Sequence, residues 1–155
     1  MRTSDGETLS WLHFFCKKIL FFLYVSQTKN QLLIHNPFLG FCLGLRLLHL
    51  NLHGLIRSHD LELGRDADTG GQTLYVLELV KGLAARPEVE KVELITRLII
   101  DRRVSSDYSN PVEKVASCAE IIRLPFGPKR YIRKELLWPY LDDLADQIVQ
   151  RLQKQ

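Results

Sequence analysis

An apolar run of strand length, a polar loop and a segment with helical spacing follow one another from residue 45, and this order constrains the fold most. The run LRLLHLNLHGLI begins at Leu45, and its near-continuous apolar character suits a strand buried on both faces. Helical spacing then starts at Gln72 and stops at Pro87. The apolar stripe of that helix consists of Val76, Leu79, Val80 and Leu83, widened by Leu77. The β-rich run KVELITR, residues 91 to 97, completes a β-α-β unit, and its usual right-handed crossover predicts a parallel sheet.

The segment after residue 97 continues this pattern. Residues 101 to 117 are polar and contain Pro111, so they are predicted to form a loop, and residues 119 to 125 supply a third strand. Leucine and isoleucine then recur at steps of three and four, at Leu137, Leu141, Leu144, Ile148 and Leu152. The predicted class is α/β, a partial doubly wound, Rossmann-like parallel sheet with helices near 71 to 86 and 134 to 153. Pro139 falls in the first turn of the second helix, where proline is tolerated.

The first 44 residues have a different composition from the rest. Six of the seven phenylalanines precede residue 50, and residues 1 to 50 hold five Lys/Arg and two Asp/Glu, against sixteen of each afterwards. We interpret residues 1 to 44 as an apolar, aromatic-rich segment not native to the domain, and residues 45 to 155 as an incomplete domain. The alternative is a membrane-associated segment. Lys17, Lys18 and the polar residues within 32 to 50 argue against a membrane span and against a secretory signal.

The overall charge and the cysteines exclude several function classes. The formal charge of +3 comes from the first third of the chain, and the later charges are interspersed, so nucleic acid is not a predicted partner. Cys16, Cys42 and Cys118 are widely spaced, which predicts a reducing, cytoplasmic location rather than a disulfide framework or a zinc site. No metal site is predicted either. Asp66 to Asp68 is interpreted as loop and helix-cap chemistry, and His53 and His59 lack a third ligand at suitable spacing.

The most informative local motif is DTGGQ, residues 68 to 72, between the first strand and the first helix. Two glycines there allow a ligand to approach the backbone, and the N–H groups of a helix start attract an anion such as phosphate. The motif is neither GxGxxG nor a P-loop. A plain turn is the alternative that these residues alone leave open.

Longer stretches resemble the sucrose-phosphate synthases, and most closely their cyanobacterial form. They are HGLIRSHDLELGRDADTGGQTLYVLELVKGLA from residue 53, ELITRLI from 93, VSSDYSNPVE from 104 and IIRLPFGPKRYIRKELLWPYLDDLAD from 121. The resemblance covers roughly residues 45 to 155. Sucrose synthases share the DTGGQ loop, but the LIRSHDLELGRDAD and PFGPKRYIRKE segments favour the phosphate-using branch.

The resemblance implies a retaining, two-domain GT-B glycosyltransferase of family 4 that transfers glucose from UDP-glucose to fructose 6-phosphate, giving sucrose 6-phosphate. The chain then corresponds to an N-terminal, acceptor-side fragment, inactive by itself and without catalytic residues. It would bind fructose 6-phosphate weakly and UDP-glucose only together with the C-terminal domain; it would hold no cofactor, and Mg²⁺ enters only as a stimulating ion. The alternatives are half of a split glycosyltransferase completed by a separate chain, and a sucrose synthase-like or non-catalytic remnant.

The resemblance also assigns substrate-binding residues. Gly71 and Gln72 correspond to the loop that contacts the acceptor sugar, and Gly70 supports that loop. Lys134 matches the lysine that reaches the fructose phosphate, and a mobile ammonium suits a compact dianion. Its side chain is expected to be exposed, and a solvated lysine at a helix start is the alternative. Arg97 is assigned the role of orienting nearby loops, with a buried structural ion pair as the alternative.

Overall fold

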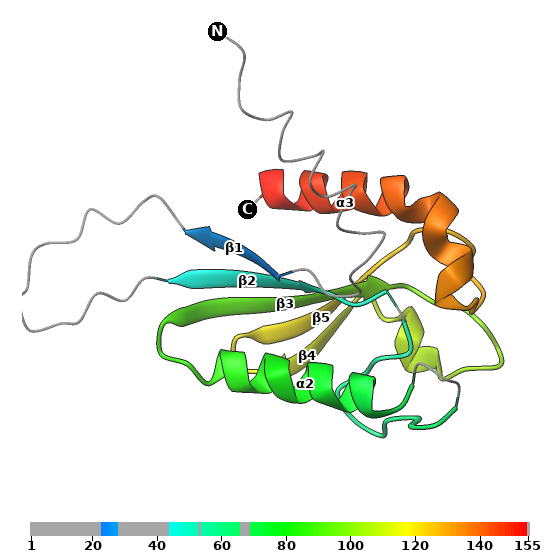
Figure 1. Ribbon diagram of the computed structural model, residues 1–155, viewed down its shortest axis with the longest axis horizontal. Coiled ribbons are helices and arrows are strands. Elements are labelled where there is room, and N and C mark those ends of the chain that lie inside the picture. The colour runs from blue at the N-terminus through cyan, green and yellow to red at the C-terminus, as the bar shows by residue number, and fades with distance from the viewer. Residues whose placement is uncertain (1–22, 28–43, 53, 66–68, 155) are drawn as a thin grey trace, which may run out of the picture.

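The structure is a computed structural model that describes residues 44–52, 54–65 and 69–154, together with the backbone of residues 23–27. A five-stranded sheet has the order β1-β2-β3-β5-β4. Its strands are β1 (Leu23–Gln27), β2 (Leu45–Leu50), β3 (Val89–Arg97), β4 (Val112–Ala116) and β5 (Ala119–Leu124). Helices α2 (Gly71–Ala84) and α3 (Leu141–Gln153) lie on opposite faces of this sheet, as Figure 1 shows.

The three central strands, β2, β3 and β5, are parallel, as predicted. The two edge strands are not, because β1 pairs with β2 and β4 pairs with β5 in antiparallel register. The expectation of a wholly parallel sheet is therefore wrong at both edges. β4 and β5 follow one another directly, and a short connection can join only antiparallel neighbours.

The core consists of two layers, one on each face of the sheet. Side chains on the α2 face include Leu47, Leu94 and Ile121, which pack with Val76, Leu77 and Val80 of α2. Side chains on the α3 face include Leu48, Ile95 and Ile122, which pack with Leu137, Leu144 and Ile148. Successive residues of a strand point to opposite faces of the sheet, so each strand contributes side chains to both core layers. This explains why the sequences of the central strands are continuous apolar runs.

Two predicted boundaries differ from the structure. The predicted loop of residues 101 to 117 contains the short 3₁₀ helix η1 (Ser106–Ser109) and strand β4. β4 reads as polar because it is an edge strand whose outward side chains meet water. The predicted helix near 134 to 153 begins as a 3₁₀ helix, η2 (Lys134–Tyr140), and becomes α-helical only at Leu141. Pro139 has no N–H to donate and its ring hinders the preceding turn, so the regular α-helix begins after it.

Most of residues 1 to 44, with Phe14, Phe21 and Phe38, lies outside the described residues. The described part is β1, whose backbone pairs with β2, and residue 44. The boundary between residues 44 and 45 stays a prediction. Among the described residues, no helix combines the length and the apolar character needed to cross a bilayer.

Candidate functional site

The carboxyl ends of β2, β3 and β5 meet at one edge of the sheet, where parallel α/β sheets place their ligands. The loop after β2 leads to Gly70–Gln72 at the start of α2, Arg97 ends β3, and the loop after β5 leads to Lys134. The topology therefore brings all of the predicted site residues to this edge. In Figure 1, α2 begins below the right-hand end of the sheet, and the segment that leads into α3 lies beyond that same end.

Gly70 and Gly71 form the N-terminus of α2. Gly70 is the N-cap, and no side chain caps the helix in the described residues, although the carbonyl of Gly70 accepts a hydrogen bond from Thr73 N–H at 3.2 Å. A Cβ atom built on either glycine meets nothing within 4 Å, so the described residues leave open space in front of this backbone. Gln72 is half-buried, while Asp66 and Asp68 lie outside the described residues. Within the described residues, a ligand could therefore approach the backbone of Gly70 and Gly71 closely.

Arg97 is completely buried and ties two loops together. Its Nη1 donates hydrogen bonds to the carbonyls of Pro128, at 2.7 Å, and Arg130, at 3.0 Å. Asp101 reinforces this connection, because its carboxylate accepts a hydrogen bond from Tyr131 N–H at 3.0 Å. Burial lowers the pKa of Arg97. Arg97 therefore holds residues 128 to 130 against the end of β3 through backbone carbonyls, and its role in orienting loops around a ligand stays a prediction.

Lys134 is the first residue of η2, on the segment that Arg97 and Asp101 anchor. Its side chain is half-buried and makes a polar or electrostatic interaction, so the expectation of a fully exposed ammonium is wrong. Whether Lys134 contacts a phosphate stays a prediction.

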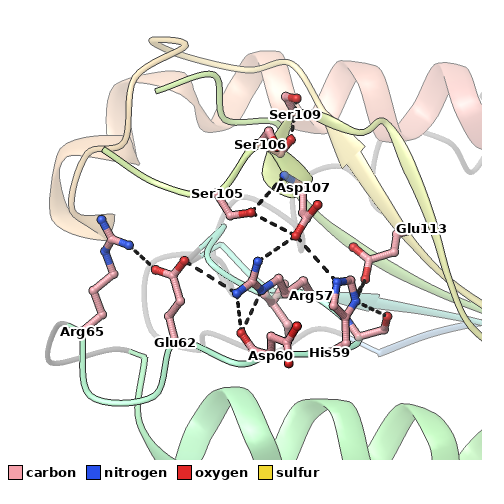
Figure 2. Close-up of polar contacts among 12 residues, drawn as sticks. Arg57, His59, Asp60, Glu62, Arg65, Ser105, Ser106, Asp107, Ser109 and Glu113 are labelled. Atoms are coloured by element: carbon pink, nitrogen blue, oxygen red, sulfur yellow. Dashed lines mark hydrogen bonds and ion pairs between the residues drawn. The ribbon is translucent and has the colours of Figure 1, made fainter. Parts of the chain in front are cut away.

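A second group of polar residues at the same edge was missed by sequence reasoning, and Figure 2 shows it. Arg57 lies at its centre. Its Nη1 donates to Asp107 Oδ2 at 2.7 Å, its Nε donates to the Asp60 carbonyl at 2.9 Å, and its guanidinium lies 5.6 Å from the centre of the Tyr108 ring. Hydrogen bonds from Ser105 and Arg57 lower the pKa of Asp107. Arg57 thus holds residues 57 to 60 against η1.

Glu113 and Arg123 form the buried part of this group. Arg123 is completely buried, and its Nη2 donates to Glu113 Oε2 at 2.5 Å and to the Ile56 carbonyl at 2.9 Å. Glu113 Oε1 accepts from Ser58 N–H at 2.6 Å. Burial raises the pKa of Glu113, but hydrogen bonds from Ser58 and Arg123 outweigh it and leave the pKa below its usual value. The pair attaches the start of the β2–α2 loop to strands β4 and β5.

His59 lies between two carboxylates of this group, as Figure 2 shows. Its Nε2 is 3.7 Å from Asp107 Oδ2, and its Nδ1 is 3.6 Å from Glu113 Oε1. Among the described residues, no set of three or more His, Cys, Asp or Glu side chains is arranged to hold a metal ion. His53 lies outside the described residues.

The hydrogen bonds described above give this group a positioning role rather than a reactive one. Its members clamp residues 56 to 62, the first half of the loop that ends in Gly70 and Gly71. The signal available in the sequence was Arg123, a charged residue inside the apolar run AEIIRLP, because a buried cation requires a partner. The identity of that partner, Glu113, could not be read from the sequence.

Comparison with known proteins finds relatives that are named sucrose-phosphate synthase. No family model matches the chain. Probable sucrose-phosphate synthase 2 of Arabidopsis thaliana is 43% identical over 122 residues, which are 70% of this chain and 12% of the relative. Sucrose-phosphate synthase of Spinacia oleracea is 45% identical over 112 residues, 63% of this chain and 11% of the relative. The chain thus spans about an eighth of the length of the curated relatives it matches. These relatives are plant proteins, so the closer resemblance to the cyanobacterial form stays a prediction. Over about two thirds of its length, this chain is homologous to one segment of the sucrose-phosphate synthases.

Proposed function

We propose that these residues are an acceptor-side segment of a sucrose-phosphate synthase, the retaining GT-B glycosyltransferase that moves glucose from UDP-glucose to fructose 6-phosphate. The observation that carries the proposal is the 43 to 45% identity to proteins of that name. The arrangement of the described residues supports it, because the loop after β2, the end of β3 and the loop after β5 converge on one edge of a parallel sheet. The same proposal places the protein in the cytoplasm.

In this proposal the backbone of Gly71 and the side chain of Gln72 contact the acceptor sugar, and Gly70 supports the loop that carries them. The open space in front of Gly70 and Gly71 supports this role, since a side chain at either position would extend into that space. Lys134 supplies positive charge to the phosphate of fructose 6-phosphate. Arg97 acts on the sugar only indirectly, by holding the loop that carries Lys134.

The described residues supply acceptor contacts rather than chemistry. Glucosyl transfer develops charge on the departing nucleotide diphosphate, and preorganised donors must stabilise that charge. In the proposal these donors and UDP-glucose belong to the second domain, and Mg²⁺ only stimulates the reaction. We therefore expect the 155 residues, tested by themselves with UDP-glucose and fructose 6-phosphate, to form no sucrose 6-phosphate above background. Product formed by the pure protein would contradict this assignment of roles.

Acceptor binding is tested by NMR titration of the ¹⁵N-labelled chain. Fructose 6-phosphate should shift the amides of Gly71 and Gln72 and the segment around Lys134, with millimolar or weaker affinity. Weak binding is expected because these residues supply few contacts to the sugar, and the cost of ordering the ligand and the loops offsets most of what those contacts contribute. Fructose is the matched ligand, since it lacks only the phosphate, and it should cause smaller shifts.

The variant Lys134→Ala should lose the extra response to the phosphorylated sugar. Lys129→Ala is the matched control, because Lys129 is an exposed lysine on the same loop whose contact to Ile100 is made by its backbone carbonyl. Equal shifts with fructose and fructose 6-phosphate would remove the phosphate role of Lys134. Equal losses in the two variants would show that the response reflects only the charge of the loop.

A further inference from the structure

A pocket of about 380 Å³ lies between α3 and the sheet, near the starts of β2 and β3 rather than at their carboxyl ends. Arg46 and Lys91 are neighbours in the parallel register, and both project toward the α3 face. Arg151 and Lys154, near the end of α3, face them across the pocket. The remaining lining residues are Leu124, Gln147 and Gln150.

Positive charges outnumber negative charges around this pocket. Its lining carries four cations, and the carboxylate beside them is Glu93, which is buried and lies 2.8 Å from Arg151 Nη2 and 3.0 Å from Lys91 Nζ. Lys91 also lies 3.5 Å from Glu120. Within the described residues, Arg46 and Lys154 have no carboxylate within ion-pair distance. Counting only the described residues, two of the four positive charges are therefore left without a matching anion.

Two hydrogen-bond donors of this pocket also have no acceptor among the described residues. Within the described part of the chain, Arg46 Nε and Arg151 Nε are buried and have no hydrogen-bond partner. A buried donor without an acceptor is unfavourable, and a cationic donor more so. The amide of Gln147 is already oriented, because its Nε2 donates to the Pro125 carbonyl at 3.1 Å and to Asp143 at 3.0 Å. Both N–H groups of this amide are thereby used, so the donors that an occupant would meet are those of the arginines and lysines.

We propose that this pocket binds a small phosphate-class dianion. Two guanidinium groups match the oxygens of a phosphate by paired hydrogen bonds, and two ammonium groups add charge without demanding a fixed geometry. Arg46 Nε and Arg151 Nε gain acceptors in the complex. The volume is within the range of small-molecule sites, so a phosphate monoester fits as well as inorganic phosphate.

The test is a titration of the ¹⁵N-labelled full chain with inorganic phosphate at constant ionic strength. Saturable shifts are expected at the amides of Arg46, Lys91, Gln150 and Arg151. Glycerol 3-phosphate, run beside glycerol, distinguishes a phosphate monoester from free phosphate as the better occupant. Shifts that do not saturate, that appear only elsewhere in the chain, or that glycerol reproduces would overturn the proposal.

Two variants and one control sharpen this test. Arg46→Gln should weaken phosphate binding about tenfold, the effect of one lost charge-assisted hydrogen bond. Lys154→Gln, at an exposed position where folding is not at risk, should weaken it about threefold. Lys114→Gln removes an exposed lysine from β4, outside the pocket, and should leave binding unchanged. An equal effect of Lys154→Gln and Lys114→Gln would mean general electrostatic attraction and would refute a built site, whether or not Arg46→Gln folds.

Discussion

Replacing Glu113 with glutamine removes the carboxylate that pairs with the buried Arg123. The side chain of Arg123 is 0% exposed and that of Glu113 is 13% exposed, so the pair is shielded from water. Leaving one member of a buried pair without its partner typically destabilises a protein by about 3 to 5 kcal/mol. Arg123 keeps its hydrogen bonds to the Asn110 and Ile56 carbonyls, and glutamine can still accept from Ser58 N–H. We therefore expect the lower end of that range, about 3 kcal/mol.

Thermal and urea denaturation, followed by circular dichroism, measure this effect. For a chain of this size a loss of about 3 kcal/mol lowers the Tm by roughly 9 °C. Glu78→Gln is the matched control. The side chain of Glu78 is 60% exposed and pairs with Lys81 at 2.9 Å on the surface of α2, so the variant should lose less than about 0.5 kcal/mol.

The pH dependence gives an independent test. The pKa of Glu113 is lowered in the folded state from its ordinary value of 4.5, so its charge stabilises the fold fully above that pH. This stabilisation is lost as the pH falls through the lower, folded-state pKa. The difference in free energy of unfolding between the wild type and Glu113→Gln should be constant near neutral pH and shrink below 4.5. A variant as stable as Glu78→Gln, or a difference that grows on acidification, would refute this account.

Two further predictions concern the core and one turn. Leu144→Ala should destabilise the fold by about 3 kcal/mol, because Leu144 is buried between α3 and the sheet, whereas Leu136→Ala, at a side chain more than half exposed, should change the urea midpoint little. In the same denaturation series, Gly54→Ala should be far more destabilising than Gly64→Ala because only the former introduces a steric clash. Equal urea midpoints for the two variants would refute this. Both glycines have positive φ, at +77° and +78°, but a Cβ on Gly54 would lie 2.8 Å from Ile99 Cδ1 while one on Gly64 meets nothing within 4 Å.

The central part of the fold could be predicted because its signals are local. Val76 and Val80 repeat at helical spacing, which indicates a helix buried on one face. The strands of the β-α-β unit are continuous apolar runs, which indicates burial on both faces of the sheet. The edge strand β4 carries no such pattern, since water covers one of its sides. Its pairing depends on β5, which follows it, rather than on its own composition.

The candidate site divides in the same way. That Gly71, Arg97 and Lys134 share one edge follows from their positions after successive parallel strands, and the structure has them there. The burial of Lys134 and the contact of Arg57 with Asp107, fifty residues further along the chain, depend on how loops pack. Such contacts have no periodicity, so they cannot be predicted from a local sequence pattern.

The path of α3 has a consequence for the open edge of the sheet. From the carboxyl end of β5 this helix runs back across the sheet, packs on Leu48 of β2 and ends with Lys154 near Arg46. By the right-handed crossover rule, a strand placed after such a helix joins the sheet beside β2, in parallel. That position is the one β1 occupies in antiparallel register. β1 and any such strand therefore cannot pair with the same edge of β2 at the same time. A chain that contained both could form a sheet with β1 at this edge or a sheet with the other strand there.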